Sequence, residues 1–97
     1  MEQIDLENNV FLRQFEVRID NHLARIEYAE QERKIFLTKL AIPKEIQNVD
    51  FEEKFIKKVF EFIAQKELRV VPTSPQIASF VRRNRSYKKF LPVGIQL

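Results

Sequence analysis

The sequence predicts an α+β fold, with an antiparallel three-strand meander, a long helix, a parallel strand and one or two short C-terminal helices. Three observations lead to this expectation. Apolar and polar residues alternate in the first part of the chain, which is typical of half-buried strands. From Asp50 to about Lys66 the apolar residues recur instead at intervals of three and four, which is typical of an amphipathic helix. A β-branched run that ends at Pro72 then predicts a strand, so that strand, helix and strand form a right-handed parallel crossover.

The first two strands of the meander are expected on either side of a tight turn. Residues 1–9 predict a short lead-in with an edge strand. A period of two runs from Phe15 to Ile19 and again from Ala24 to Tyr28. Residues 20–21 are Asp and Asn and supply turn chemistry, and the polar residues 30–33 make the next reversal. Short links of this kind join antiparallel neighbours.

The third strand, Ile35 to Ile42, is expected at the centre of the sheet. Strict alternation places Phe36, Leu40 and Ile42 on one face and Ile35, Leu37 and Ala41 on the other. Apolar residues on both faces are typical of a strand that is covered on both sides. Pro43 ends the strand, because proline cannot donate to the ladder.

The helices have recognisable starts. Asp50 and Glu53 predict a capping box at the start of the long helix. Ser74 followed by Pro75 predicts a second helix, with the hydroxyl at the cap and proline at the first helical position. The long helix has the apolar stripe Phe51, Phe55, Val59, Phe62 and Ile63, the second helix has Ile77, Phe80 and Val81, and a final turn has Tyr87, Phe90 and Leu91.

The composition predicts one small globular domain over residues 1–97, since 44% of the side chains are apolar and 32% are charged. The absence of cysteine excludes disulfides, thiolate nucleophiles and cysteine-ligated zinc, and it fits a reducing compartment. The sole glycine, Gly94, excludes a glycine-rich phosphate loop. No apolar run approaches the roughly twenty residues of a membrane span, so we expect a cytoplasmic protein.

Charge is distributed unevenly along the chain. Residues 1–67 hold 11 basic and 14 acidic side chains, a net charge of −3, whereas residues 68–97 hold six basic side chains and no acidic one, +6. We call Arg82, Arg83, Arg85, Lys88 and Lys89 the basic surface. It is interpreted as a solvated face, a site for a small phosphorylated ligand or a nucleic-acid site. Nucleic acid is the least favoured, because the spacing contains no base-reading motif.

Metal sites and nucleophilic triads find little support in the sequence. His22 is the only imidazole and lies beside a predicted turn, with no second ligand at a suitable spacing. We therefore expect an exposed turn histidine and no metal site. Ser74 has a sufficient role as a helix cap and lacks a histidine partner for nucleophilic catalysis.

The order of these elements, combined with local sequence, resembles a known family. The segments that carry the resemblance are Phe15-Glu16-Val17-Arg18, Ile42-Pro43-Lys44-Glu45-Ile46, and Val70-Val71-Pro72 followed by Ser74-Pro75. Over residues 11–91 the chain resembles the small single-domain GNAT-type N-acetyltransferase-like family, which has the acyl-CoA N-acyltransferase fold. The resemblance implies a GNAT-like fold and an acetyl-CoA site.

The resemblance also implies where acetyl-CoA would bind. The C-terminal half of the central strand offers backbone groups to the pantetheine, and a Gln/Arg-x-x-Gly-x-Gly/Ala motif at the next helix start holds the pyrophosphate. The motif falls on residues 47–52, where Gln47 fits but Asp50 and Glu52 replace the small residues. The expected cofactor-binding residues are Leu40, Ala41, Ile42, Gln47, Asn48, Val49, Asp50, Phe51, Glu52 and Ser74. Because the carboxylates repel an anion and obstruct its approach, we expect weak binding of CoA or none.

The resemblance predicts transfer of an acetyl group from acetyl-CoA to an amine, if the domain is active. Many family members carry His-Thr-Glu where residues 39–41 are Lys-Leu-Ala, and a cysteine where Ser74 stands. Lys39, Glu45 and Tyr87 are the candidate bases, and the catalytic residue stays unassigned. The alternative is a non-catalytic interaction domain that binds an anionic partner through the basic surface.

Overall fold

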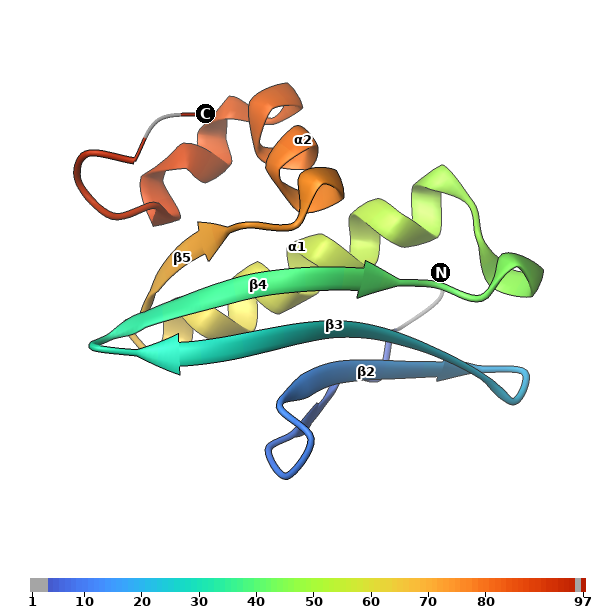
Figure 1. The fold of residues 1–97 in the computed structure, drawn as a ribbon. Helices are drawn as coiled ribbons and strands as arrows, with labels where there is room; N and C mark the ends of the chain where they lie inside the picture. The colour runs from blue at the N-terminus through green and yellow to red at the C-terminus, as the bar shows by residue number, and fades with distance from the viewer. Residues whose placement is uncertain (1–3, 96) are drawn as a thin grey trace.

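The computed structural model describes residues 4–95 and residue 97 (Figure 1). Within them, one mixed sheet is accompanied by two α-helices and two short 3-10 helices. The elements are β1 (Glu7–Asn9), β2 (Gln14–Ile19), β3 (His22–Gln31), β4 (Lys34–Ala41), η1 (Lys44–Ile46), α1 (Val49–Gln65), β5 (Arg69–Pro72), α2 (Pro75–Arg83) and η2 (Arg85–Phe90). The predicted α+β architecture is confirmed. Of the predicted lead-in, residues 1–3 lie outside the described part, and β1 is its edge strand.

The strands follow one another across the sheet in the order β1-β2-β3-β4-β5. Each of the first three pairings is antiparallel, and β4 and β5 are parallel. The 17-residue helix α1 connects β4 to β5, because a parallel pair cannot be joined by a tight turn. The interior position predicted for the third strand is therefore confirmed, with β3 on one side of β4 and β5 on the other. The predicted cover on both of its faces is wrong, because α1 covers one face and no described helix crosses the other (Figure 1).

The predicted division of β4 into two faces is wrong. Opposite β3, Glu27 pairs with Lys39 but Tyr28 pairs with Leu37, so Thr38 is an extra residue on β4. An extra residue reverses the alternation beyond it. Ile35 and Leu37 are thus on the face that Leu40 and Ile42 share, where the latter two pack against the core. Phe36 and Ala41 belong to the opposite face.

The core lies between the sheet and α1, which runs behind the strands in Figure 1. The helix contributes six buried side chains, Phe51, Phe55, Ile56, Val59, Phe60 and Ile63. The strands contribute Phe15, Val17, Ala24, Ile26, Ile35, Leu37 and Val70. Phe60 also joins α1 to the C-terminal segment, since its ring lies 6.2 Å from Phe80 and 5.5 Å from both Tyr87 and Phe90. These contacts hold α2 and η2 beside β5.

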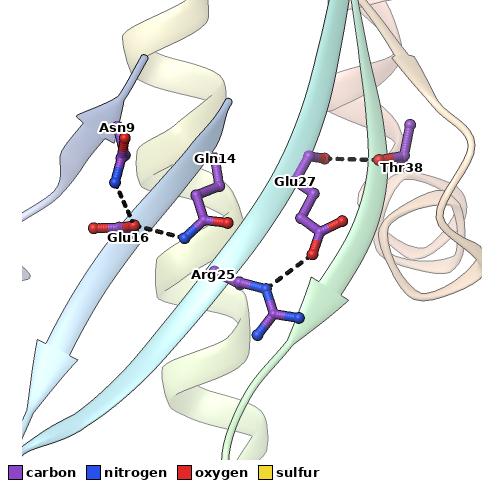
Figure 2. A network of polar contacts seen from close by, with 6 residues as sticks. All are labelled: Asn9, Gln14, Glu16, Arg25, Glu27 and Thr38. Carbon is purple, nitrogen blue, oxygen red and sulfur yellow. Dashed lines mark hydrogen bonds and ion pairs between the residues drawn. The ribbon is translucent and has the colours of Figure 1, made fainter. Parts of the chain in front are cut away.

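The opposite face of the sheet carries polar side chains beside Leu23, Phe36 and Ala41, and no described helix crosses in front of β2, β3 and β4 (Figure 1). We call this the open face. Figure 2 shows its hydrogen bonds, in which Asn9 and Gln14 both donate to the Glu16 carboxylate at 3.0 and 2.6 Å. Arg25 Nε donates to Glu27 at 2.9 Å, and Thr38 Oγ1 donates to the Glu27 carbonyl at 3.2 Å. The sheet therefore has one apolar face against α1 and one face of mixed, mainly polar character, in a two-layer arrangement.

The two α-helices begin differently. The capping box predicted from Asp50 and Glu53 is wrong, because the cap of α1 is Asn48, whose Oδ1 accepts from the Phe51 amide at 2.7 Å. Asp50 instead lies within the first turn. The prediction for α2 is confirmed, since Ser74 caps it and Pro75 is its first residue. Over the described residues, no helix is long and apolar enough to cross a membrane.

Candidate functional site

A cavity of about 440 Å³ lies at the C-terminal end of β4, and we call it the β4 cavity. It is lined by Leu23 and Arg25 of β3, by Leu40 and Ala41 of β4, by Ile42, Pro43 and Gln47 of the following loop, and by Gln76 of α2. Its volume lies in the range of small-molecule sites, which is roughly 300 to 1,000 Å³. Three separate parts of the chain meet here, namely β3, the end of β4 with the loop that follows it, and the start of α2.

The cavity exists because β4 extends beyond β5. Their pairing stops at Leu37 opposite Pro72, whereas β4 continues to Ala41. The Leu37 carbonyl accepts from the Ser74 amide at 2.8 Å and from Thr73 Oγ1 at 3.1 Å. These bonds end the parallel pair, and the chain then turns away into α2 (Figure 1). The β5 side of β4 beyond Leu37 therefore has no paired strand in the described part of the chain.

The structure brings four of the predicted cofactor residues together. Leu40, Ala41, Ile42 and Gln47 all line the β4 cavity. Ser74 lies just behind its wall, because the fully buried Ser74 hydroxyl donates to Gln76 Oε1 at 3.1 Å and also accepts from the Ile77 amide at 3.4 Å. Ser74 is thus a buried cap that orients a cavity residue.

The remaining predicted residues, at the start of α1, do not line the cavity. Asn48 is occupied as the helix cap, Phe51 is buried in the core, and Val49 is 72% exposed. The Glu52 carboxylate accepts from Gln47 Nε2 at 2.9 Å, and Asp50 lies 3.1 Å from Lys54 Nζ. The predicted set therefore divides into a strand-end group at the cavity and a helix-start group beside it.

The carboxylates at the start of α1 are partly neutralised by nearby cations. Besides the Asp50–Lys54 pair, Glu53 Oε2 lies 3.6 Å from Arg83 Nη2. Exposed pairs of this kind contribute only about 0 to 1 kcal/mol, so the negative potential at this helix start is reduced rather than removed. Two backbone amides at this helix start are also engaged, since Asn48 accepts from Phe51 through its side chain and from Glu52 through its carbonyl.

Sequence reasoning missed Leu23, Arg25, Pro43 and Gln76. Arg25 is the one charged group on the cavity wall, and it lies there because β3 and β4 pair Arg25 opposite Ala41. Its outward position in an alternating strand was visible in the sequence, but its neighbour was not. Gln76 could have been inferred from its place directly after the Ser74-Pro75 helix start.

The candidate bases do not converge on the cavity. Lys39 is exposed on the open face, and the exposed Glu45 of η1 has its carboxylate 3.8 Å from Nδ1 of His22, the first residue of β3. The Tyr87 ring packs against Phe60 and Phe80, and burial, with a smaller effect from Glu61, raises the pKa of Tyr87 above its usual value. A raised pKa makes a tyrosine a poorer base at neutral pH. In the described residues, no group of three or more His, Cys, Asp or Glu side chains could hold a metal ion.

The basic surface lies on the last turn of α2 and on η2, away from the lining of the β4 cavity. Four of its five side chains are exposed and Lys88 is half-buried. Arg83 is held by Ser79 Oγ at 2.7 Å and by Glu53, whereas Lys89 lies 5.5 Å from the centre of the Phe90 ring. This surface therefore concentrates positive charge on one short segment of the chain.

The chain was compared with known proteins. Residues 14–90 match the model of a family described as GCN5-related N-acetyl-transferase. The match covers most of the chain, from β2 to the last residue of η2. No curated protein matches it.

Proposed function

Because the chain belongs to the GCN5-related N-acetyltransferase family, we propose that it binds acetyl-CoA weakly at the β4 cavity, as an acetyltransferase-type domain of low activity. A single observation carries this proposal. The unpaired side of β4 opens directly into a cavity of about 440 Å³. Four of the residues expected from the family resemblance line that cavity, namely Leu40, Ala41, Ile42 and Gln47.

The strand end fits the acyl-pantetheine part of the cofactor. An extended chain with amide groups, such as pantetheine, can pair with unpaired backbone groups much as an additional strand does. Leu40 and Ile42 supply apolar walls against which such a chain can pack. Gln76 has its carbonyl engaged by Ser74, so its NH₂ group is the part that can donate to a ligand.

The start of α1 does not fit the pyrophosphate in the way the family motif would. Asp50 and Glu52 stand where small residues would let the anion approach, and the amides of Phe51 and Glu52 already have partners. Each carboxylate at 4 Å from a phosphate charge opposes binding by about 1 kcal/mol in water and by more near a protein surface. We therefore expect affinity to come chiefly from the pantetheine end.

The cavity walls favour binding over rapid catalysis. When bound, acetyl-CoA supplies an activated thioester whose acetyl group an amine can accept. An amine must first lose its ammonium proton, which requires a base or a water chain. The eight lining residues include Arg25 as their charged member and no carboxylate or imidazole. Proton removal thus depends on solvent, and this is the basis for the low activity proposed.

Isothermal calorimetry with acetyl-CoA and with acetyl-pantetheine tests this proposal. Both compounds should bind with similar, weak affinity, and Ala41→Phe should abolish binding by filling the cavity. The control is Ala29→Phe, which adds the same bulk at an exposed alanine on the same face, near the opposite end of β3. No heat and no shift in Tm with either compound at millimolar concentration would refute the site, because a ligand that binds only the folded state raises Tm.

A second candidate function is binding of an anionic partner by the basic surface. The observation behind it is a cluster of exposed cationic side chains on one short segment. Among the described residues, Arg83 is the one member of this cluster that forms an ion pair. Neutralising Arg82, Arg83 and Arg85 should weaken binding to a polyanion such as heparin and flatten its salt dependence. The matched control replaces Arg13, Arg18 and Arg33, which removes the same charge elsewhere. Equal weakening by both variants would assign the effect to net charge and not to this surface.

A further inference from the structure

The turn between β1 and β2 exposes three consecutive apolar side chains. Val10 is 69% exposed, Phe11 is 93% exposed and Leu12 is 57% exposed. Burying a side chain of this size is worth about 1.5 to 3 kcal/mol, so an exposed run of three is unusual on a monomeric surface. Figure 1 shows this turn projecting from the sheet just before β2, on the side away from β4 and β5. We call residues 10–12 the apolar turn.

The apolar turn is held in its conformation by hydrogen bonds. The Leu12 amide donates to Asn9 Oδ1 at 3.0 Å, and the Tyr28 amide donates to the Arg13 carbonyl at 3.0 Å. Asn9 is itself fixed, because its side-chain NH₂ donates to Glu16. A positioned turn loses little conformational entropy when it binds, and it therefore presents Phe11 as a pre-formed projection.

A second cavity lies at the same end of the molecule, and we call it the far cavity. It has a volume of about 250 Å³ and is lined by Asn8, Phe15, Tyr28, Glu30, Ile35, Phe62, Ile63, Lys66 and Leu68. Two of these residues, Asn8 and Phe15, flank the segment that contains the apolar turn. A cavity of roughly 150 Å³ with apolar walls holds a benzene molecule, so the far cavity is large enough for a phenyl ring. The chain's own Phe11 does not occupy it, since that side chain is almost fully exposed.

We propose that two copies of this chain associate through a two-fold contact in which Phe11 of each copy enters the far cavity of the other. A projection and a matching cavity that lie side by side on one molecule can satisfy each other twice in a closed, symmetric pair. Phe15, Tyr28 and Phe62 then surround the incoming ring, and aromatic pairs add about 0.5 to 1.5 kcal/mol beyond the area buried.

The charges around both features allow the same arrangement. Arg13 follows the apolar turn, and the lining of the far cavity carries one charge of each sign, Glu30 and Lys66. In the pair, Arg13 of one copy faces the partner's Glu30, and the reverse contact is made by symmetry. The contact is small, because it consists mainly of three side chains and one cavity from each copy. Interfaces at the low end of the size range are transient, so we expect a reversible dimer that forms at high protein concentration.

Tryptophan fluorescence provides the first test, because the natural chain contains no tryptophan. Phe11→Trp places a single reporter at the tip of the turn. Its emission should shift to shorter wavelength as protein concentration rises to about 1 mM, which is a reasonable range for a weak contact. Addition of excess Phe11→Asp protein should cause the same shift, since that variant lacks the projection but keeps the cavity.

Sedimentation velocity provides the second test. The natural chain should sediment faster with increasing concentration, whereas Phe11→Asp should remain a monomer. Val93→Ser is the matched control, because Val93 is also fully exposed but lies outside the contact. A monomer at every concentration, or an emission that shifts with lipid vesicles but not with protein, would overturn the proposal. So would a dimer that persists unchanged in Phe11→Asp. These readouts need no acetyl-CoA and are independent of the function proposed above.

Discussion

The two faces of the sheet differ in what they can contribute. The face toward α1 is built from fully buried apolar side chains such as Phe15, Ile26 and Leu37. The open face carries Glu16, Arg25 and Glu27, all partly exposed and joined by hydrogen bonds. Burial of apolar area is the main source of folding stability, whereas partly exposed polar pairs contribute little. Stability therefore depends on one face, and the other can be changed with little cost to the fold.

The largest effect is expected at Phe55, which is fully buried where α1 meets the sheet. Phe55→Ala should lower the free energy of unfolding by about 3 to 5 kcal/mol, because it removes apolar contacts and leaves a cavity. Arg18→Ala, at an exposed position on the open face, should change it by no more than about 0.5 kcal/mol. Urea denaturation measures both. Similar losses in the two variants would remove the contrast between the faces.

The second-largest effect is expected at the start of α1, which follows the loop that lines the β4 cavity. The double change Asp50→Gly and Glu52→Ala removes two charges that oppose an anion, and we expect roughly three- to tenfold tighter binding of acetyl-CoA. Binding of acetyl-pantetheine should stay the same, because it lacks the pyrophosphate. Glycine in the first turn should also cost about 1 kcal/mol of stability.

A matched control for that variant is Glu30→Ala with Glu32→Ala, which removes the same charge at the far end of β3. Calorimetry on both variants separates a local effect from one of net charge. Equal gains in the two, or an unchanged affinity in the first, would show that the carboxylates at the helix start are not the obstacle.

Local patterns in the sequence predict the elements and their order well. The stripe at intervals of three and four residues predicts α1, and the Ser74-Pro75 pair predicts the start of α2, because both signals depend on neighbours along the chain. For α1 the sequence predicts a cap at Asp50, two residues after the observed cap at Asn48. Asn48 and Asp50 are both good caps, and only the structure shows that capping at Asn48 places Phe51 in the core.

The cavity wall was predicted only in part, because it depends on pairing between strands. The extra residue Thr38 reverses the alternation of β4, and nothing in a single strand reveals where its partner shifts register. Arg25 faces the cavity because it pairs with Ala41 across 16 positions of sequence. The prediction of Leu40, Ala41 and Ile42 comes from a family resemblance. A family pattern reflects which segments lie together in the folded protein, and local patterns do not.

A smaller effect is expected from the ion pair between Arg25 and Glu27, whose side chains are 34% and 36% exposed. A double-mutant cycle with Arg25→Ala and Glu27→Ala should give a coupling of about 0.2 to 1 kcal/mol. Arg25→Ala should also change the affinity for acetyl-CoA, because Arg25 lines the cavity and Glu27 does not. A coupling above about 2 kcal/mol would mean that the open face contributes substantially to stability, and would contradict the view that stability depends on the face toward α1.

The smallest effect is expected from Tyr87, on the apolar side, at alkaline pH. Burial, reinforced by Glu61, raises its pKa above the ordinary value of 10.0, so the folded state favours the neutral phenol. A raised pKa gives stability that is fully present below pH 10 and is lost as the pH rises through the folded-state value. Tyr87→Phe keeps the ring against Phe60 and Phe80 but removes the titration. Above pH 10, urea midpoints of the natural chain should therefore fall more steeply than those of Tyr87→Phe. All other groups are common to both proteins and cancel in the difference, so parallel curves would show that the Tyr87 hydroxyl is as well solvated in the folded state as in the unfolded chain.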